Sequence, residues 1–88
     1  MSDQPEALTP IKPERLAREI RELCAEHNSG QITELQYEQR FARMIGEVRD
    51  RRLAGDRADV LKVLGALRDD GTVTSKEWDR LIRSLGLI

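Results

Sequence analysis

The sequence predicts an all-α fold, a four-helix bundle made of two pseudo-repeated αα-hairpins that follow an extended N-terminal arm. The 88 residues are 39% apolar and 35% charged, with one Phe, one Tyr and one Trp, a composition that β-strands disfavour. Apolar residues recur with helical spacing in four segments, and glycine-centred breaks separate these segments. A chain of this length can build one modest core, which predicts a single helical domain.

The N-terminal arm is expected over residues 1–12, where prolines interrupt the chain and no helical period is present. Its sizeable apolar side chains are Leu8 and Ile11, which are candidates to lie across a groove of the body. Pro13 suits the first turn of a helix, where a backbone N–H is not needed. The helical domain is therefore expected over 13–88.

Hairpin one is expected over 13–54. Apolar residues at i, i+4, i+7 and i+8 predict a first helix over 13–27, which Gly30 ends by adopting a left-handed conformation. The same spacing predicts a second helix over 34–53, with Gly55 marking its end. The two apolar stripes consist of Leu16, Ile20, Leu23, Cys24 and His27, and of Tyr37, Phe41, Met44, Ile45 and Val48.

Hairpin two is expected over 56–88, with Asp56 as the N-cap of its first helix. The run from Asp69 to Gly71 ends that helix, and Thr74 caps the helix that follows. Gly65 lies inside the first of these helices, where glycine costs about 1 kcal/mol relative to alanine. This glycine predicts either close packing of another helix at this position or a locally less stable helix. The apolar faces consist of Val60, Leu61, Leu64 and Leu67, and of Trp78, Leu81, Ile82 and Leu85.

An internal repeat relates the two hairpins at an offset of 41 residues. Each corner has a glycine for positive φ, a β-branched residue, a threonine N-cap with an acid or amide three residues later, and an aromatic residue that packs on the β-branched one. Every one of these features has a structural reason, so the repeat predicts fold and not chemistry. The corner residues are Gly30, Ile32, Thr33 and Tyr37, and Gly71, Val73, Thr74 and Trp78.

The second copy, VLKVLGALRDDGTVTSKEWDRLIRSL over 60–85, resembles the short C-terminal domain called SHOCT. The first copy, IRELCAEHNSGQITELQYEQRFARMI over 20–45, is similar but has Gln36 where the family has an acid. Members of the family usually carry a single copy at the end of a longer protein, whereas this chain has two. The resemblance implies a role in oligomerisation or protein contact.

Glycine, an apolar residue and a later acid are also marks of an EF-hand, but the ligand positions do not fit. Ala66 and Arg68 stand where the second loop needs oxygen ligands, and the first loop offers no carboxylate among Ala25, His27, Ser29 and Gln36. Calcium binding is therefore not expected. One cysteine and one histidine cannot build a metal site, and no catalytic set is recognisable, so we expect no cofactor and no enzyme activity.

The segment from Arg40 to Arg57 carries a local excess of three positive charges. It is either an ordinary charged helix face with i, i+4 pairing or a binding patch for an acidic protein surface or for phosphates. The arginines are Arg40, Arg43, Arg49, Arg51, Arg52 and Arg57.

Taken together, these features predict a small non-catalytic protein–protein interaction module: an adaptor, an inhibitor or an oligomerisation domain. The partner is expected to be a protein, and a homodimer is one form of this. The alternative is a small nucleic-acid-associated regulator that uses the arginine segment, although the net charge of -1 argues against it.

Leu87 and Ile88 add an apolar tip that either docks a partner or closes the end of the bundle. No apolar run is long enough to cross a membrane, and the first residues do not resemble a secretory signal, so we expect a cytoplasmic protein.

Overall fold

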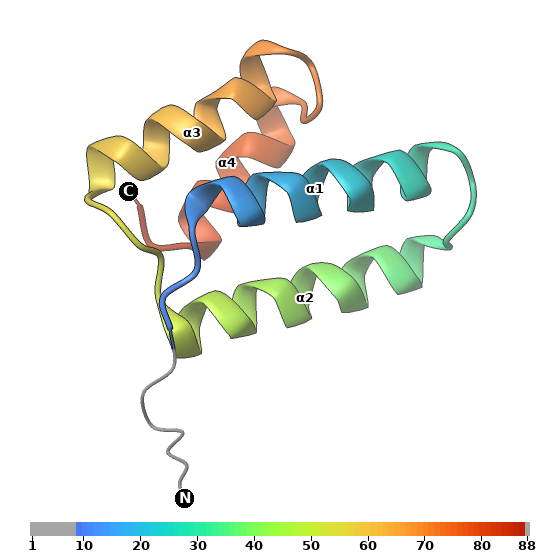
Figure 1. The fold of residues 1–88 in the computed structure, drawn as a ribbon. Helices are drawn as coiled ribbons and strands as arrows, with labels where there is room; N and C mark the ends of the chain where they lie inside the picture. Colours follow the sequence, from blue (N-terminus) through green and yellow to red (C-terminus); the bar gives the residue numbers. More distant parts are fainter. Residues whose placement is uncertain (1–8, 88) are drawn as a thin grey trace, which may run out of the picture.

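The computed structural model describes residues 9–87, and over this range it is helical, as the sequence predicts (Figure 1). Helix α1 pairs with α2 as an antiparallel hairpin, α3 crosses α1 on the opposite side, and α4 lies behind them. The expected fold class, a small helical bundle, is confirmed. The helices are α1 (Pro13–Asn28), α2 (Glu34–Arg51), α3 (Arg57–Asp69) and α4 (Ser75–Ser84).

The end of α2 corrects the sequence prediction. The helix stops at Arg51, before Leu53, and Gly55 is not the residue that ends it. The C-cap residue is Arg52, which has φ 67° and ψ 163°, a combination nearly reserved for glycine. An unfavourable backbone conformation of this kind persists only where the surrounding structure enforces it.

Backbone hydrogen bonds from the N-terminal arm hold Arg52 in this conformation. The Ile11 N–H donates to the Arg52 carbonyl at 2.9 Å, and the Ile11 carbonyl accepts from the Ala54 N–H at 2.8 Å. These two bonds make an isolated parallel β-bridge between Ile11 and Leu53. The Ile11 side chain is 3% exposed and belongs to the core, so the expected contact of the arm with the body is confirmed at this residue. Leu8 lies outside the described residues.

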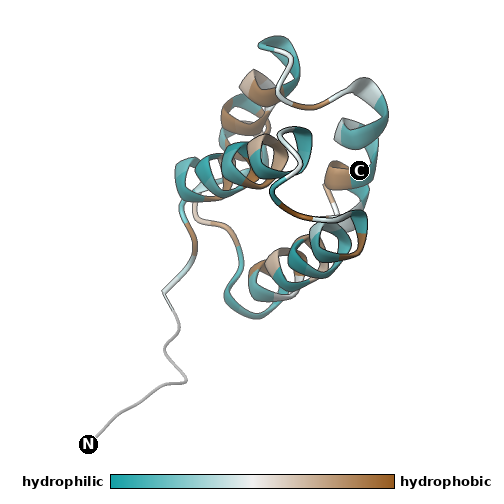
Figure 2. Ribbon diagram, turned by 90° about the vertical axis from the view of Figure 1, so that its right-hand side faces the viewer, coloured by the Kyte–Doolittle hydropathy of each residue, from teal (hydrophilic) through white to brown (hydrophobic). Residues whose placement is uncertain are grey.

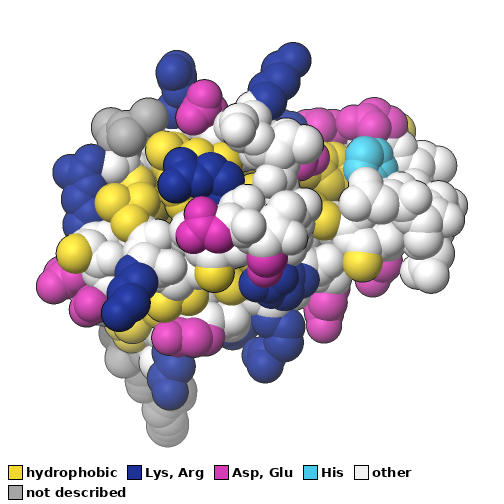
Figure 3. Space-filling view, turned by 90° about the horizontal axis from the view of Figure 1, so that it is seen from above, with side chains coloured by type: hydrophobic (Ala, Val, Ile, Leu, Met, Phe, Trp, Pro, Cys, Tyr) yellow, Lys and Arg dark blue, Asp and Glu magenta, His cyan; other side chains and the backbone are white. Residues whose placement is uncertain are grey.

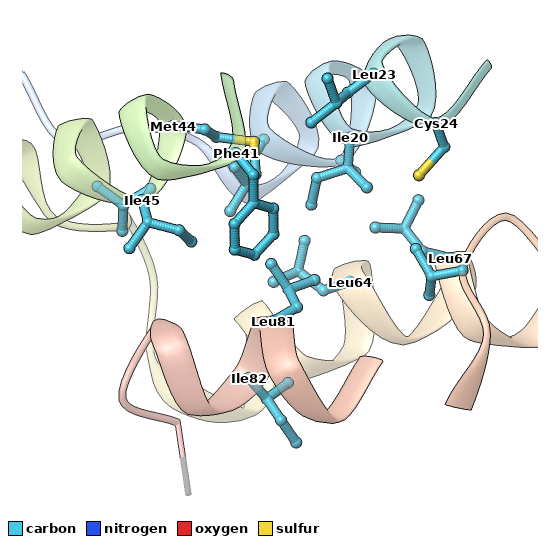
Figure 4. Packing of buried hydrophobic residues seen from close by; sticks show 14 of the residues in the cluster. Ile20, Leu23, Cys24, Phe41, Met44, Ile45, Leu64, Leu67, Leu81 and Ile82 are labelled. Carbon is cyan, nitrogen blue, oxygen red and sulfur yellow. The ribbon is translucent and has the colours of Figure 1, made fainter. Parts of the chain in front are cut away.

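The core is assembled around α1, which packs against both α2 and α3. Apolar residues of all four helices face one interior, and hydrophilic residues face outward (Figure 2). In Figure 4 Phe41 of α2 projects between the helices toward Leu64 of α3 and Leu81 of α4. The predicted stripes are buried except for His27, Leu61 and Leu85, which are half-buried at the edge of the core. Leu16, Leu64, Leu67 and Leu81 are the largest fully buried side chains.

The two corners have the predicted construction. Gly30 and Gly71 have φ of 81° and 83°, and both following helices begin with a complete capping box on Thr33 and Thr74. Tyr37, Val73 and Trp78 are buried, whereas Ile32 is half-buried. The repeat therefore predicts the local structure of both corners.

The C-terminal tail folds back onto the bundle over its described part. Gly86 has φ 73°, and the Leu87 N–H donates to the Ile82 carbonyl at 2.9 Å, which closes the end of α4. Leu87 is half-buried against the core, and the Arg57 guanidinium donates to its carbonyl. The packing of Leu87 agrees with the closing alternative, whereas partner docking at this tip stays a prediction, and Ile88 lies outside the described residues.

Candidate protein interface along α2

The six predicted arginines do not form one patch. In Figure 3 the basic side chains are dispersed over the visible face and lie beside acidic ones. Arg40 of α2 forms an ion pair with Glu26 of α1. Arg51 binds Glu47 one turn earlier at 2.9 Å, and its Nε donates to the Thr9 carbonyl at 2.9 Å. Both arginines therefore hold the bundle together.

The remaining four arginines divide between the linker and the surface. Arg57 holds the Leu87 carbonyl, and Arg52 supplies the strained backbone at the end of α2. Arg43 and Arg49 are exposed, and neither has an ion-pair partner within residues 9–87. Among the arginines of α2, only Arg43 and Arg49 are both exposed and without an ion-pair partner in the described range. They lie on opposite flanks of α2, because each lines a different surface hollow.

The flank of α2 toward α1 forms a groove of about 330 Å³, which we call the α1–α2 groove. Its floor includes Leu23 and Met44, and its walls carry charges of both signs. Arg15 also crosses from α1 to Glu47 at 3.2 Å. The charges on the walls of the groove are therefore largely neutralised by ion pairs within the chain. Its lining residues are Glu19, Glu22, Leu23, Arg40, Arg43, Met44 and Glu47.

The flank of α2 toward α4 forms a smaller depression of about 270 Å³, which we call the α2–α4 hollow. The floor is apolar, one wall is made of small residues, and the charged side chains that line it are both arginines. No carboxylate lines it. The lining residues are Phe41, Ala42, Ile45, Gly46, Arg49, Arg80 and Ser84.

Arg80 is fixed at the rim of this hollow by two contacts. Its guanidinium lies 4.3 Å from the ring centroid of Phe41 and donates to both oxygens of Glu38, at 2.9 and 2.5 Å. The hydrogen bond from Arg80 lowers the pKa of Glu38, and the same contact raises the pKa of Arg80. Sequence analysis missed this pair because its members lie in different hairpins, 42 residues apart.

Leu35 is a second residue that sequence analysis did not single out. It lies in the first turn of α2 and is 67% exposed, the one large apolar side chain within residues 9–87 that is exposed to this degree. The sequence signal that could have singled out Leu35 is its position outside the apolar stripe of α2. A single exposed leucine is ordinary on a protein surface, so it adds little by itself.

Cys24 and Tyr37 lie in the interior of the bundle. Cys24 is 6% exposed, and burial raises the pKa of its thiol. Burial, with smaller contributions from Cys24 and Glu77, raises the pKa of Tyr37 to about 12. His27 stacks on the Tyr37 ring at a centroid distance of 4.3 Å, and its Nε2 lies 2.8 Å from Glu34. These side chains pack the first corner, as the predicted apolar position of Cys24 implies.

Asp70 joins the second corner to α1. Arg21 donates to Thr72 at 2.8 Å and pairs with Asp70 at 2.6 Å, while Asp70 accepts from both the hydroxyl and the N–H of Thr72. The hydrogen bonds from Thr72 and Arg21 lower the pKa of Asp70 to about 2. The cluster is a structural tie between hairpins, and its groups are satisfied by one another.

Over the described range, the side chains of His, Cys, Asp and Glu do not gather in groups of three or more suited to a metal ion. Among the described helices, none has the length and apolar character needed to span a membrane. The SHOCT resemblance and the expectation of no calcium binding stay predictions. Comparisons with protein-family models, with curated proteins and with solved structures give no match.

Proposed function

We propose that this chain is a small non-catalytic protein–protein interaction module whose partner surface lies along α2. The observation that supports it is the pairing, on each flank of α2, of an exposed arginine with an apolar floor. Arg43 adjoins Met44 and Leu23, and Arg49 adjoins Phe41 and Ile45. Arginine, methionine and aromatic residues are enriched in protein interfaces, and arginine is among the residues that most often dominate the binding energy.

The physical mechanism is surface complementarity. The exposed arginines orient an approaching partner through charge and supply most of the contact area, because the floor side chains are themselves only 3–8% exposed. The resemblance of the corners to SHOCT, a domain associated with protein contact, is in keeping with this role. Phosphate binding finds less support, because three arginines of the segment bind carboxylates or carbonyls of the same chain.

The test reverses the charge of the two exposed arginines. Arg43→Glu combined with Arg49→Glu is compared with Lys62→Glu combined with Lys76→Glu, which changes exposed residues of other helices by the same total charge. Each tagged chain is used to capture partners from cells of the source organism, with quantitative mass spectrometry. We expect a protein that the wild type and the lysine control retain and that the arginine variant loses.

Two other outcomes would contradict the proposed function. A partner captured equally by all three chains would place the interface away from α2. Recovery of nuclease-sensitive material, with affinity that falls steeply as salt rises, would favour the nucleic-acid alternative, because phosphate contacts release counterions.

A further inference from the structure

We propose that the α2–α4 hollow is a docking site for an acidic segment of another protein, which places a carboxylate on Arg49 and an apolar side chain in the hollow that Gly46 keeps open. This inference rests on the proposed interaction role and names the site and the chemistry of the partner. It is carried by two independent observations, one on Gly46 and one on charge.

Gly46 has no internal reason to be glycine. It lies in the interior of α2, where glycine costs about 1 kcal/mol relative to alanine. A Cβ built on Gly46 would meet no other atom within 4 Å, so no helix of this chain packs closely enough to require its absence. The position lines the hollow, and any side chain there would occupy part of it. The glycine therefore keeps open a space that the chain does not itself fill.

The charges around the hollow select the partner. The α1–α2 groove and the hollow beside the linker, lined by Lys12, Glu14, Asp59 and Lys62 among others, both contain carboxylates as well as cations. The α2–α4 hollow is lined by Arg49 and Arg80 and by no carboxylate.

The two arginines of the hollow have different roles. Arg80 is neutralised by Glu38 and held against Phe41. Arg49, by contrast, has no ion-pair partner among residues 9–87. A carboxylate from a partner would complete the charge balance at Arg49, in the two-pronged geometry that guanidinium groups favour.

The size of the hollow limits what it can hold. About 270 Å³ accommodates one or two side chains of a short segment and not a packed helix face. Ile45 and Phe41 form an apolar floor, and Ala42 and Ser84 leave the walls low. The expected ligand is therefore a segment in which a large apolar side chain lies beside Asp or Glu.

The experiment selects ligands from a phage-displayed library of random 12-residue peptides, with the full chain as target. We expect the enriched peptides to be net acidic with a neighbouring large apolar residue. A synthetic peptide of the most enriched sequence is then titrated by fluorescence anisotropy. Replacing Arg49→Gln is expected to weaken binding by about tenfold or more, the effect of removing one charge-assisted contact.

The hollow itself is tested with a matched pair of variants. Gly46→Leu fills the hollow and is expected to abolish peptide binding. Gly65→Leu makes the same change in α3, where a Cβ also meets nothing within 4 Å, and is expected to leave binding unchanged. Circular dichroism confirms that both variants stay helical. Enriched peptides that are basic or neutral, no enrichment at all, or equal loss in both variants would overturn the proposal.

Two other occupants are tested in the full chain. Neutralising the acidic residues before the described range, Asp3→Asn with Glu6→Gln, leaves peptide affinity unchanged if the site serves another protein; a tenfold gain would assign the hollow to this segment instead. Sedimentation of a dimer that Gly46→Leu dissociates would assign the hollow to a second copy of this chain.

If the peptide tests fail while capture of a native partner still depends on Arg43 and Arg49, the proposed function stands and this site does not.

Discussion

Gly30 and Gly71 show at the level of single residues how the sequence specifies a corner. Both glycines have φ above +80°, and a Cβ built on either would meet nothing within 4 Å. The demand for glycine at these corners is therefore conformational and not steric. Each precedes a threonine whose side chain accepts the N–H three residues later, so the turn and the next helix start are specified together.

Replacing Gly30→Val or Gly71→Val is expected to lower the free energy of unfolding by about 1–2 kcal/mol, because an L-residue at positive φ is strained and β-branching adds to the strain. Gly30→Asn is the control, since asparagine tolerates this region best. Urea unfolding followed by circular dichroism measures all three. Equal losses for valine and asparagine would show that φ is not the cause.

Tyr37 is the one tyrosine of the chain, so its ionisation can be followed directly. Its pKa is raised to about 12, mainly by burial, and the folded state therefore holds this proton more tightly than the unfolded state does. Its contribution to stability is complete below pH 10 and is lost as the pH rises from about 10 to about 12. Absorbance at the tyrosinate band during alkaline titration is expected to give a midpoint near 12. A midpoint near 10 in the folded chain would contradict the burial of this hydroxyl.

At the level of elements, the glycines inside helices resolve a choice that the sequence left open. Gly65 predicted either close helix packing or a weak point in α3, and the empty space around its Cβ position excludes close packing. Gly46 in α2 is in the same situation but borders the hollow. The two residues therefore share an energetic cost and differ in what surrounds them.

Substituting Gly65→Ala is expected to raise the free energy of unfolding by about 0.5–1 kcal/mol, because alanine loses less backbone entropy in a helix and no neighbour obstructs its methyl group. Gly46→Ala should give a similar gain. Chemical denaturation measures both values. A loss of stability at Gly65 would mean that another helix approaches α3 more closely than the structure has it.

At the level of the whole molecule, ion pairs between elements orient the four helices. Arg21 joins α1 to the corner of hairpin two, Arg40 joins α2 to α1, and Arg80 joins α4 to α2. These pairs are partly exposed, so each adds little stability by itself, and apolar burial dominates the energy of folding. The pairs of Arg21 and Arg80 link hairpin one to hairpin two, whereas the pair of Arg40 links the two helices of hairpin one.

Asp70 gives this arrangement a measurable pH dependence. Its pKa is lowered from 3.8 to about 2, so its stabilising effect is present above pH 4 and is lost as the pH falls from about 4 to about 2. Asp70→Asn removes the titrating group, and the variant is expected to show a shallower decline in unfolding free energy over this window. Denaturation at several pH values between 2 and 5 compares the two chains. Identical slopes would show that Arg21 and Thr72 do not hold the carboxylate in solution.

Helical periodicity, caps and glycines were sufficient to determine four helices, both corners and most of the core, because hydrogen bonds within a helix and its first and last turns depend on residues close in the chain. The end of α2 was decided by tertiary structure, since the N–H of Ile11, more than 40 residues away in the chain, donates a hydrogen bond to the carbonyl of Arg52. Packing also separated Arg43 and Arg49 from the arginines that the chain uses internally, and it formed the α2–α4 hollow from two hairpins. The sequence could predict a basic segment, but which charges stay unpaired depends on partners that only folding brings within reach.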